Sequence, residues 1–273
     1  MQKIVITFLL GFSMILGNMT SLEANEREPL ESFGNYFDGF QGTFVLYDES
    51  RELYTIYNPE QSLKRLTPCS SSKIYNALIG LETGVIADEN FVIQWDGTPQ
   101  PMAMWEKDQT LALAISGSVV WYYKEFIHQV GKERAQWYYD EMDYGNRDIS
   151  GGQVFVDPKG DPFWIRSSLK INAIEQVDLL TKFYKYDLPF SKRNIEIVKK
   201  CIILSDKDGI VFSGKTGSGS EKGKYIVGWF VGSIEKDGKR YNFATNIEGT
   251  DGASGGKARE ISIEILKDMR LLN

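Results

Sequence analysis

The segments that favour β-strands lie at the two ends of this chain, and a long, mostly helical stretch separates them. Residues 43–47 and 53–57 are rich in β-branched and aromatic residues and flank a polar turn, which is typical of a hairpin. Residues 209–213, 225–234 and 241–246 have the same character, and a helix with an apolar stripe closes the chain. This order predicts an α/β (α+β) fold, in which both chain ends build a central antiparallel sheet flanked by helices around an inserted all-helical lobe.

The middle of the chain supplies the predicted helical lobe, at approximately residues 85–205. A helix is expected from Ser70 to Glu82, and helical patterns continue from residue 108 to residue 142. Residues 144–168 lack a helical period and are rich in Gly, Asp and Pro, which indicates a long loop of the kind that is usually functional. We expect the functional site in the cleft between the sheet and the lobe.

The first 24 residues have the pattern of an export signal. Lys3 precedes an apolar run from Ile4 to Leu16, and small and polar residues follow up to Ala24. Glycine, serine and asparagine interrupt the run, which makes it a poor permanent membrane span. We therefore expect residues 1–24 to be removed and residues 25–273 to work as one secreted or periplasmic domain without stable membrane insertion. A signal that is not cleaved would instead anchor the protein.

The composition excludes several classes of protein. Of 273 residues, 42% are hydrophobic and 25% are charged, as in an ordinary globular chain. The net charge is -6 and no long basic run occurs, so no nucleic-acid partner is expected. His128, Cys69 and Cys201 are too few donors for a zinc site, so no metal is expected. We favour two free cysteines, although export would permit a Cys69–Cys201 disulfide.

A serine nucleophile in this chain needs a base other than histidine, unless it uses His128, and a Ser-Lys pair is the obvious alternative. Ser-x-x-Lys occurs four times, but only Ser70 and Lys73 lie at the start of a clearly predicted helix, where a spacing of three places both side chains on one face. The free N–H groups of that helix end would point at a developing oxyanion. Taken alone, an N-capping serine beside a solvated lysine explains this pair equally well.

Three further short motifs follow the Ser-Lys pair. They are Ser118-Val119-Val120, Tyr144-Gly145-Asn146 and Lys215-Thr216-Gly217. Each is common by itself, but four motifs in this order on plausible elements are a strong signal. With these motifs the chain resembles the class D (oxacillinase-type) serine β-lactamases, which belong to the penicillin-recognising serine enzymes. The resemblance extends from about residue 42 to the C-terminus. Tyr-Gly-Asn, and the lack of an obvious loop glutamate in the class A style, favour class D over class A.

The resemblance implies a β-lactamase/transpeptidase-like catalytic domain that hydrolyses the β-lactam ring of penicillins and related antibiotics, giving antibiotic resistance. Ser70 would attack the β-lactam carbonyl to form an acyl-enzyme. Lys73 would act as general base after its amine captures carbon dioxide as a carbamate, so bicarbonate would be needed and no other cofactor is expected. Burial, which lowers the pKa of a lysine, would supply the neutral amine that this capture requires.

The resemblance also assigns roles to residues around this pair. Val120 and Trp164 would surround the modified lysine, and the Trp164 indole N–H would steady the carbamate. Ser118 would relay a proton to the leaving nitrogen. The backbone N–H groups of Ser70 and Ser218 would form the oxyanion hole.

The small-molecule β-lactam would be held at the far end of the site. Lys215, Thr216 and Arg259 would bind the substrate carboxylate, with Gly217 on the strand edge beside it, and Tyr144 would shape the site. Arg259 also has an argument of its own. A cation in the first turn of a helix opposes the helix dipole, so Arg259 at the start of the last helix predicts a bound anion.

One residue departs from the family pattern, and several interpretations stay open. Ser72 stands where phenylalanine is common, and a smaller, polar neighbour of Lys73 would weaken carbamate formation and slow deacylation.

Sensor domains of β-lactam-response proteins share these motifs but stay acylated. A cell-wall transpeptidase or carboxypeptidase would use the same Ser-Lys pair, and a non-catalytic binding module would leave the motifs as coincidence. The preferred β-lactams and the oligomeric state are not predicted.

Overall fold

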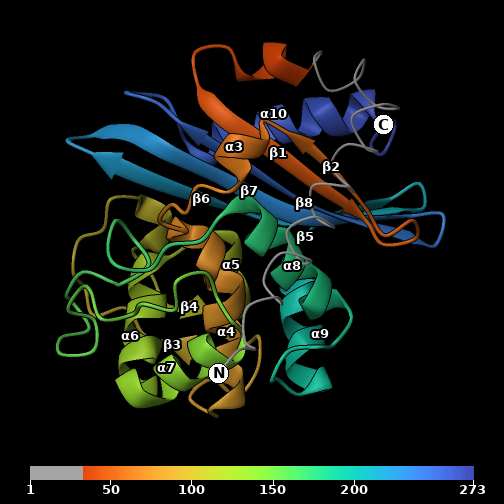
Figure 1. Ribbon diagram of the computed structural model, residues 1–273. Helices are drawn as coiled ribbons and strands as arrows, with labels where there is room; N and C mark the ends of the chain where they lie inside the picture. The colour runs from red at the N-terminus through yellow and green to blue at the C-terminus, as the bar shows by residue number, and fades with distance from the viewer. Residues whose placement is uncertain (1–32) are drawn as a thin grey trace, which may run out of the picture.

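Both chain ends contribute to one six-stranded antiparallel sheet, which is the upper layer of the computed structural model in Figure 1. The structure describes residues 33–273, so the predicted export signal lies outside the described residues. The strand order is β2-β1-β8-β7-β6-β5, and β1 pairs with β8 from Gln41 opposite Glu248 to Asp48 opposite Tyr241. The predicted sheet is therefore confirmed. Its strands are β1 (Gln41–Asp48), β2 (Leu53–Tyr57), β5 (Ile203–Lys207), β6 (Ile210–Glu221), β7 (Lys224–Lys236) and β8 (Lys239–Glu248).

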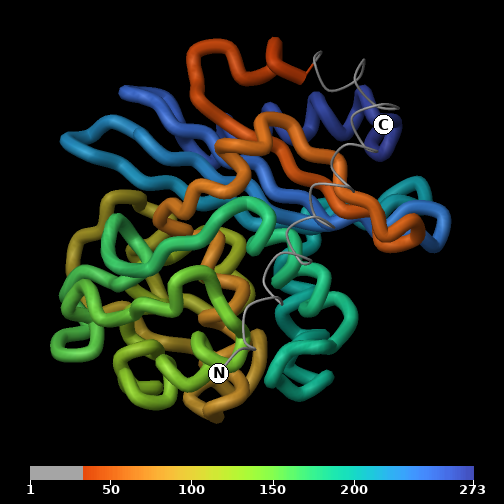
Figure 2. Tube along the Cα trace, viewed as in Figure 1, coloured from red at the N-terminus to blue at the C-terminus, as the bar shows by residue number. Residues whose placement is uncertain are grey.

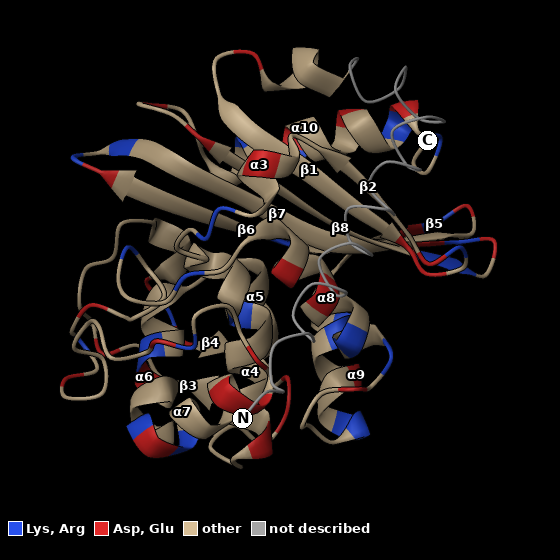
Figure 3. Cartoon of the chain, in the orientation of Figure 1, with Lys and Arg blue, Asp and Glu red and all other residues tan. Residues whose placement is uncertain are grey.

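The two faces of the sheet bury separate cores because side chains alternate along each strand. In β7, Trp229 and Val231 belong to the core that faces the helical lobe, and Phe230 belongs to the core on the opposite face. The C-terminal helix α10 (Gly255–Asp268) and the short 3-10 helix η1 (Phe33–Phe37) cover that opposite face. The strand tips carry charges of both signs, whereas the strands between them are largely uncharged (Figure 3).

The lobe below the sheet surrounds one buried helix, α4 (Lys73–Glu82), which follows the 3-10 turn η2 (Cys69–Ser72). Residues 73 to 81 of α4 are all buried, and the helix contacts α5, α6 and α9. The remaining helices are α3 (Pro59–Ser62), η3 (Ala103–Trp105), α5 (Leu111–Ser116), α6 (Val120–Val130), α7 (Lys132–Glu141), α8 (Ala173–Tyr184) and α9 (Lys192–Cys201). The lobe is not purely helical, because β3 (Val92–Ile93) and β4 (Gln109–Thr110) form a two-stranded sheet too short to show a sequence period.

Two differences from the predicted strands bear on the site. The strand predicted at residues 209–213 continues as β6 to Glu221, so Lys215, Thr216 and Gly217 lie within a strand rather than after it. The edge strand β5 was not predicted, because its polar, mostly exposed sequence does not alternate.

The long loop predicted at residues 144–168 is present and runs along the lobe up to the sheet (Figure 2). Two hydrogen bonds connect its first turn to Lys170. The Asn146 N–H donates to the Lys170 carbonyl at 2.9 Å, and the Lys170 N–H donates to Asn146 Oδ1 at 2.8 Å. Gly145, between Tyr144 and Asn146, has a φ of 54°. A Cβ at Gly145 would lie 2.0 Å from the Lys170 carbonyl oxygen.

We expect Gly145→Ala to destabilise the protein far more than Gly209→Ala. Both glycines have positive φ, which costs an alanine about 1–2 kcal/mol. Gly209 has nothing within 4 Å of the added Cβ, whereas the overlap at Gly145 adds a further cost of about 1–3 kcal/mol. Urea unfolding of the two variants measures the difference, and equal destabilisation would contradict the close approach at Gly145.

Candidate active site

Ser70 lies in the turn that leads into α4, directly beneath strand β6. A Cβ at Gly217 would lie 2.7 Å from the Pro68 carbonyl oxygen and 3.2 Å from the Ser70 nitrogen. The strand and the turn can therefore approach this closely only with glycine at position 217. Cys69, which precedes Ser70, has a φ of 50°, a conformation that non-glycine residues adopt only where the surroundings hold them. The first turn of the predicted helix is thus a 3-10 turn, η2, rather than α-helix.

Lys73 is fully buried at the first position of α4, with its amine against Ser70. Its Nζ lies 2.8 Å from Ser70 Oγ, 2.9 Å from the Ser118 carbonyl oxygen and 3.3 Å from Ser118 Oγ. Burial, together with the nearby charge of Lys215, holds the pKa of Lys73 well below its usual value. The Tyr123 ring centroid lies 5.3 Å from the amine. A neutral lysine amine in hydrogen-bonding contact with a serine hydroxyl has the geometry of a base and its nucleophile.

The Ser118 hydroxyl lies between the amines of Lys73 and Lys215. Lys215 Nζ lies 3.0 Å from Ser118 Oγ and 3.0 Å from the Thr216 carbonyl oxygen. Burial lowers the pKa of Lys215 to about 7. Ser118 has a φ of 57°, so its backbone too is held in a conformation that needs support from its surroundings. The four groups form a continuous chain of possible proton transfers from Ser70 to Lys215.

Trp164 carries a buried donor without a hydrogen-bond partner in the described part of the chain, and its carbonyl contacts Thr67, three residues before Ser70. Its side chain is fully buried, and its indole N–H has no hydrogen-bond partner among the described residues. Because a buried donor without an acceptor is costly, such a group fits an acceptor that the chain itself does not supply. The carboxylate expected on Lys73 would be such an acceptor, and it remains a prediction. The Ser72 hydroxyl does not serve as this acceptor. It donates to the Cys69 carbonyl at 2.9 Å.

Two cavities are lined by other predicted site residues, although neither Ser70 nor Lys73 is among their lining residues. The larger, about 670 Å³, is lined in part by Trp105, Val120, Trp121, Ile165 and Ser218. It brings Val120 and Ser218, which are far apart in the sequence, to one space. The Ser218 hydroxyl also accepts a hydrogen bond from the Gly255 N–H at 2.8 Å.

The smaller cavity, about 110 Å³, is lined in part by Lys215, Thr216, Phe230 and Arg259. Arg259 is exposed and forms no ion pair or hydrogen bond with the residues that the structure describes. Helix α10 begins at Gly255, so Arg259 is its fifth residue and lies beyond the first turn. The prediction that Arg259 opposes the helix dipole in the first turn was therefore wrong, but its place in this cavity gives it access to an anion bound there.

Tyr144 lies behind the site rather than at its surface. It is fully buried, and its ring packs edge-on against Tyr75 and Tyr139 at centroid distances of 5.3 and 5.2 Å. This packing suits the expected role in shaping the site and leaves no room for substrate contact. His128 contacts the long loop instead of the Ser-Lys pair. Its Nδ1 lies 2.9 Å from the Val154 carbonyl oxygen.

Sequence reasoning missed two residues of the site, Tyr123 and Thr67. Tyr123 lies three positions after the predicted Val120, but a buried aromatic residue in a helix indicates only packing. Thr67 precedes the Ser-Lys turn, and its hydroxyl donates to the Trp164 carbonyl at 3.1 Å. No local pattern connects residues 67 and 164, so only the fold could reveal this contact.

A serine, two buried lysines and a second serine meet at the junction of an antiparallel sheet and a helical lobe, which is the arrangement of the penicillin-recognising serine proteins. The family model described as the penicillin binding protein transpeptidase domain matches residues 42–267. The chain belongs to this family, in its class D β-lactamase branch. No helix among residues 33–273 is long and apolar enough to cross a membrane.

Relatives with two kinds of name are similar to the chain. The probable β-lactamase YbxI of Bacillus subtilis (strain 168) is 38% identical over 91% of this chain and 90% of its own length. The regulatory protein BlaR1 of Bacillus licheniformis is 36% identical over 97% of this chain, which spans only 45% of BlaR1. The solved structure of the class D β-lactamase BAT-2 has a TM-score of 0.81 and 38% identity, covering 88% of this chain and 96% of that structure.

We expect the stability of the protein to rise with pH between about 7 and about 10.5, and Lys215→Met to reduce this slope. In that window Lys215 is neutral when folded and protonated when unfolded, so the unfolded state binds more protons and a higher pH favours folding. One proton corresponds to a slope of about 1.4 kcal/mol per pH unit. Urea unfolding across the window measures the slope, with Lys222→Met, in the exposed β6–β7 turn, as the control. An unchanged slope in Lys215→Met would contradict the burial of a neutral amine.

Proposed function

We propose that this protein is an extracytoplasmic class D β-lactamase that hydrolyses penicillins and related β-lactams through an acyl-enzyme on Ser70. The observation that carries the proposal is the fully buried Lys73 amine, 2.8 Å from Ser70 Oγ and with a pKa held well below its usual value. The unsatisfied Trp164 N–H supports the further proposal that Lys73 works as a carbamate. The export pattern of residues 1–24 supports the location.

In the acylation step, Ser70 Oγ attacks the β-lactam carbonyl carbon while Lys73 takes the hydroxyl proton. The Oγ–C bond forms and the ring C–N bond breaks. The leaving nitrogen receives a proton through Ser118, whose hydroxyl contacts both lysine amines. Lys215, with a pKa of about 7, keeps a positive charge available to the substrate carboxylate near neutral pH.

In the deacylation step, water attacks the ester carbonyl carbon, the Oγ–C bond breaks and Ser70 regains its proton. Carbon dioxide bound to Lys73 would supply a carboxylate base for both steps. Trp164 would donate its indole N–H to that carboxylate, and Val120, which lines the larger cavity, would lie beside it. The N–H groups of Ser70 and Ser218 stabilise the oxyanion of each tetrahedral intermediate.

A sensor that stays acylated is the second candidate, and the hydrogen bonds of the Lys73 amine favour it. The Lys73 amine already reaches three oxygen atoms, on Ser70 and Ser118. An amine held in this way reacts less readily with carbon dioxide, and a site without the carbamate loses its base for deacylation. The similarity to BlaR1 is as extensive as the similarity to YbxI.

The first experiment mixes the purified mature protein with a chromogenic penicillin or cephalosporin over a range of bicarbonate concentrations. We expect many turnovers per protein molecule, stimulated by bicarbonate and reduced by roughly 10²–10⁴-fold or more in Lys73→Ala, because a general base contributes that much. Lys222→Ala, in the exposed β6–β7 turn, is the control. A single burst with a lasting adduct on Ser70 would instead make the protein a sensor, and absence of labelling would make it a binding module.

Arg259→Ala is expected to raise KM for a penicillin by roughly 10–100-fold and to change kcat little, since a hydrogen bond to a charged group contributes about 1.5–3 kcal/mol in both the ground and transition states. Arg259→Lys should recover part of the loss. Lys267→Ala, an exposed lysine near the end of the same helix, is the control. Steady-state kinetics measure KM and kcat separately. A fall in kcat with unchanged KM would contradict carboxylate binding by Arg259.

A further inference from the structure

Thr67 joins three parts of the molecule at the start of the Ser-Lys turn. Its hydroxyl donates to the Trp164 carbonyl at 3.1 Å and accepts from the Arg166 N–H at 3.0 Å. Its own carbonyl accepts from the Trp229 indole N–H, on strand β7, at 2.9 Å. Only 5% of Thr67 is exposed, so water does not replace these bonds. One residue therefore ties the long loop and the sheet to the segment that carries Ser70.

The hydroxyl of Thr67 is itself held in place. Pro68 follows it and restricts its backbone to extended conformations, and a β-branched side chain has few rotamers. The hydroxyl holds the peptide groups on both sides of Ile165, in a turn where Arg166 has a φ of 50°. A non-glycine residue keeps this conformation only where other contacts impose it. The Thr67 hydroxyl is such a contact. It accepts from the N–H of Arg166, which is the second residue after Trp164.

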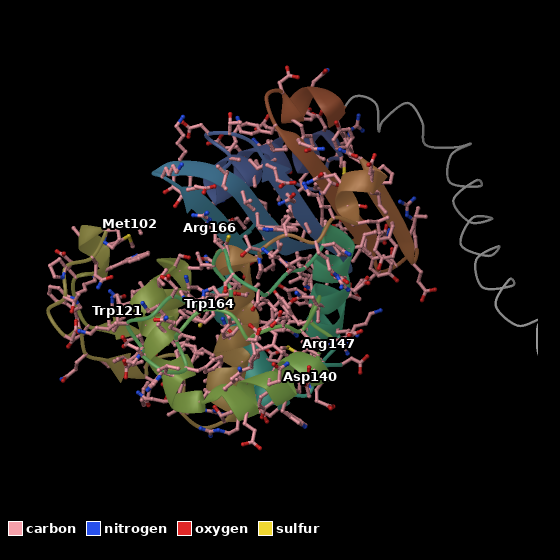
Figure 4. The ribbon with its side chains drawn as sticks, turned by 60° about the vertical axis from the view of Figure 1, so that its left-hand side comes forward. Met102, Trp121, Asp140, Arg147, Trp164 and Arg166 are labelled. Carbon is pink, nitrogen blue, oxygen red and sulfur yellow. The ribbon has the colours of Figure 1, made fainter. Side chains whose placement is uncertain are left out.

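The other attachment of this turn is exposed. Arg166 Nη1 donates to the Ser220 carbonyl at 2.8 Å, and Arg166 pairs with Glu221 at 3.2 Å. In Figure 4, Arg166 lies between Trp164 in the lobe and the strands above it. The Arg166 and Glu221 side chains are 41% and 49% exposed, so solvent competes for this pair. Of the contacts that hold this turn, the buried bonds to Thr67 are therefore the ones for which solvent does not compete.

We propose that Thr67 is a positioning residue that holds the Trp164 indole N–H where the Lys73 carbamate needs its donor. The inference rests on the carbamate of the proposed function but not on turnover. Without the Thr67 hydroxyl, the Trp164 carbonyl and the Arg166 N–H lose their buried partner, and the turn relaxes. The indole donor then shifts, and a higher bicarbonate concentration is needed to keep Lys73 carboxylated.

The test titrates the full protein with ¹³C-bicarbonate and measures the carbamate signal by ¹³C NMR. We expect Thr67→Val to raise the half-saturating bicarbonate concentration by roughly 10-fold or more, which is the size of effect that supporting residues have on a bound ligand. Thr67→Ser, which keeps the hydroxyl, should stay within about twofold of the wild type. Turnover of the chromogenic β-lactam should need the same added bicarbonate and recover at saturation.

Thr245→Val is the matched control, because Thr245 is also fully buried and its hydroxyl bonds Ser262 at 2.6 Å on the opposite face of the sheet. It should lower the melting temperature without changing the bicarbonate titration. Arg166→Ala, which removes only the exposed link, should have a smaller effect than Thr67→Val. If Thr67→Val does not fold, Thr67→Ala takes its place.

Two results would overturn the inference: a wild-type titration curve in a folded Thr67 variant, or no carbamate signal in the wild type at any bicarbonate concentration. A wild-type carbamate without turnover would instead contradict hydrolysis, and the Thr67 variants would still test the positioning role.

Discussion

Two lysine amines buried at one junction determine the rest of this site. Lys73 is fully buried and Lys215 is 5% exposed, and neither has a carboxylate partner among the described residues. A charged amine in such a place would cost several kcal/mol. This cost lowers the pKa of both amines, and it lowers that of Lys73 well below its usual value, so a neutral base lies next to Ser70. The helical lobe supplies Lys73 and the sheet supplies Lys215, so the low pKa values exist only when the two layers are packed together.

That packing requires backbone conformations that an isolated segment would not adopt. Cys69, Ser118 and Arg166 all have positive φ, at 50°, 57° and 50°, and each lies at or beside a residue of the site. Gly217 lets β6 approach the Ser70 turn more closely than any other residue would. The strain at these positions is offset by the surrounding cores, which explains why the site forms where two rigid layers meet rather than on one mobile loop.

The sequence predicted the sheet and the Ser-Lys pair because both depend on local patterns. Alternation indicates strands, and a spacing of three on a helix brings Ser70 to Lys73. Contacts between distant segments leave no such pattern. Thr67 meets Trp164 across the fold, and the polar edge strand β5 lacks alternation altogether. The dipole argument for Arg259 was wrong for a different reason. The helix begins at Gly255, a few residues earlier than that argument assumed, and helix ends are hard to place from a sequence pattern.

The proposed hydrolysis and the sensor alternative differ in whether Lys73 carries a carbamate. As a free amine, Lys73 keeps its contacts with Ser70 and Ser118. As the proposed carbamate it would give up part of these contacts and would satisfy the Trp164 donor, and an unmade buried hydrogen bond costs about 1–3 kcal/mol. Since about 1.4 kcal/mol changes an equilibrium tenfold, small changes around Lys73 move the balance from one state to the other. Relatives named as a β-lactamase and as a regulatory protein are about equally similar to this chain, so their shared architecture does not decide between the two candidate functions.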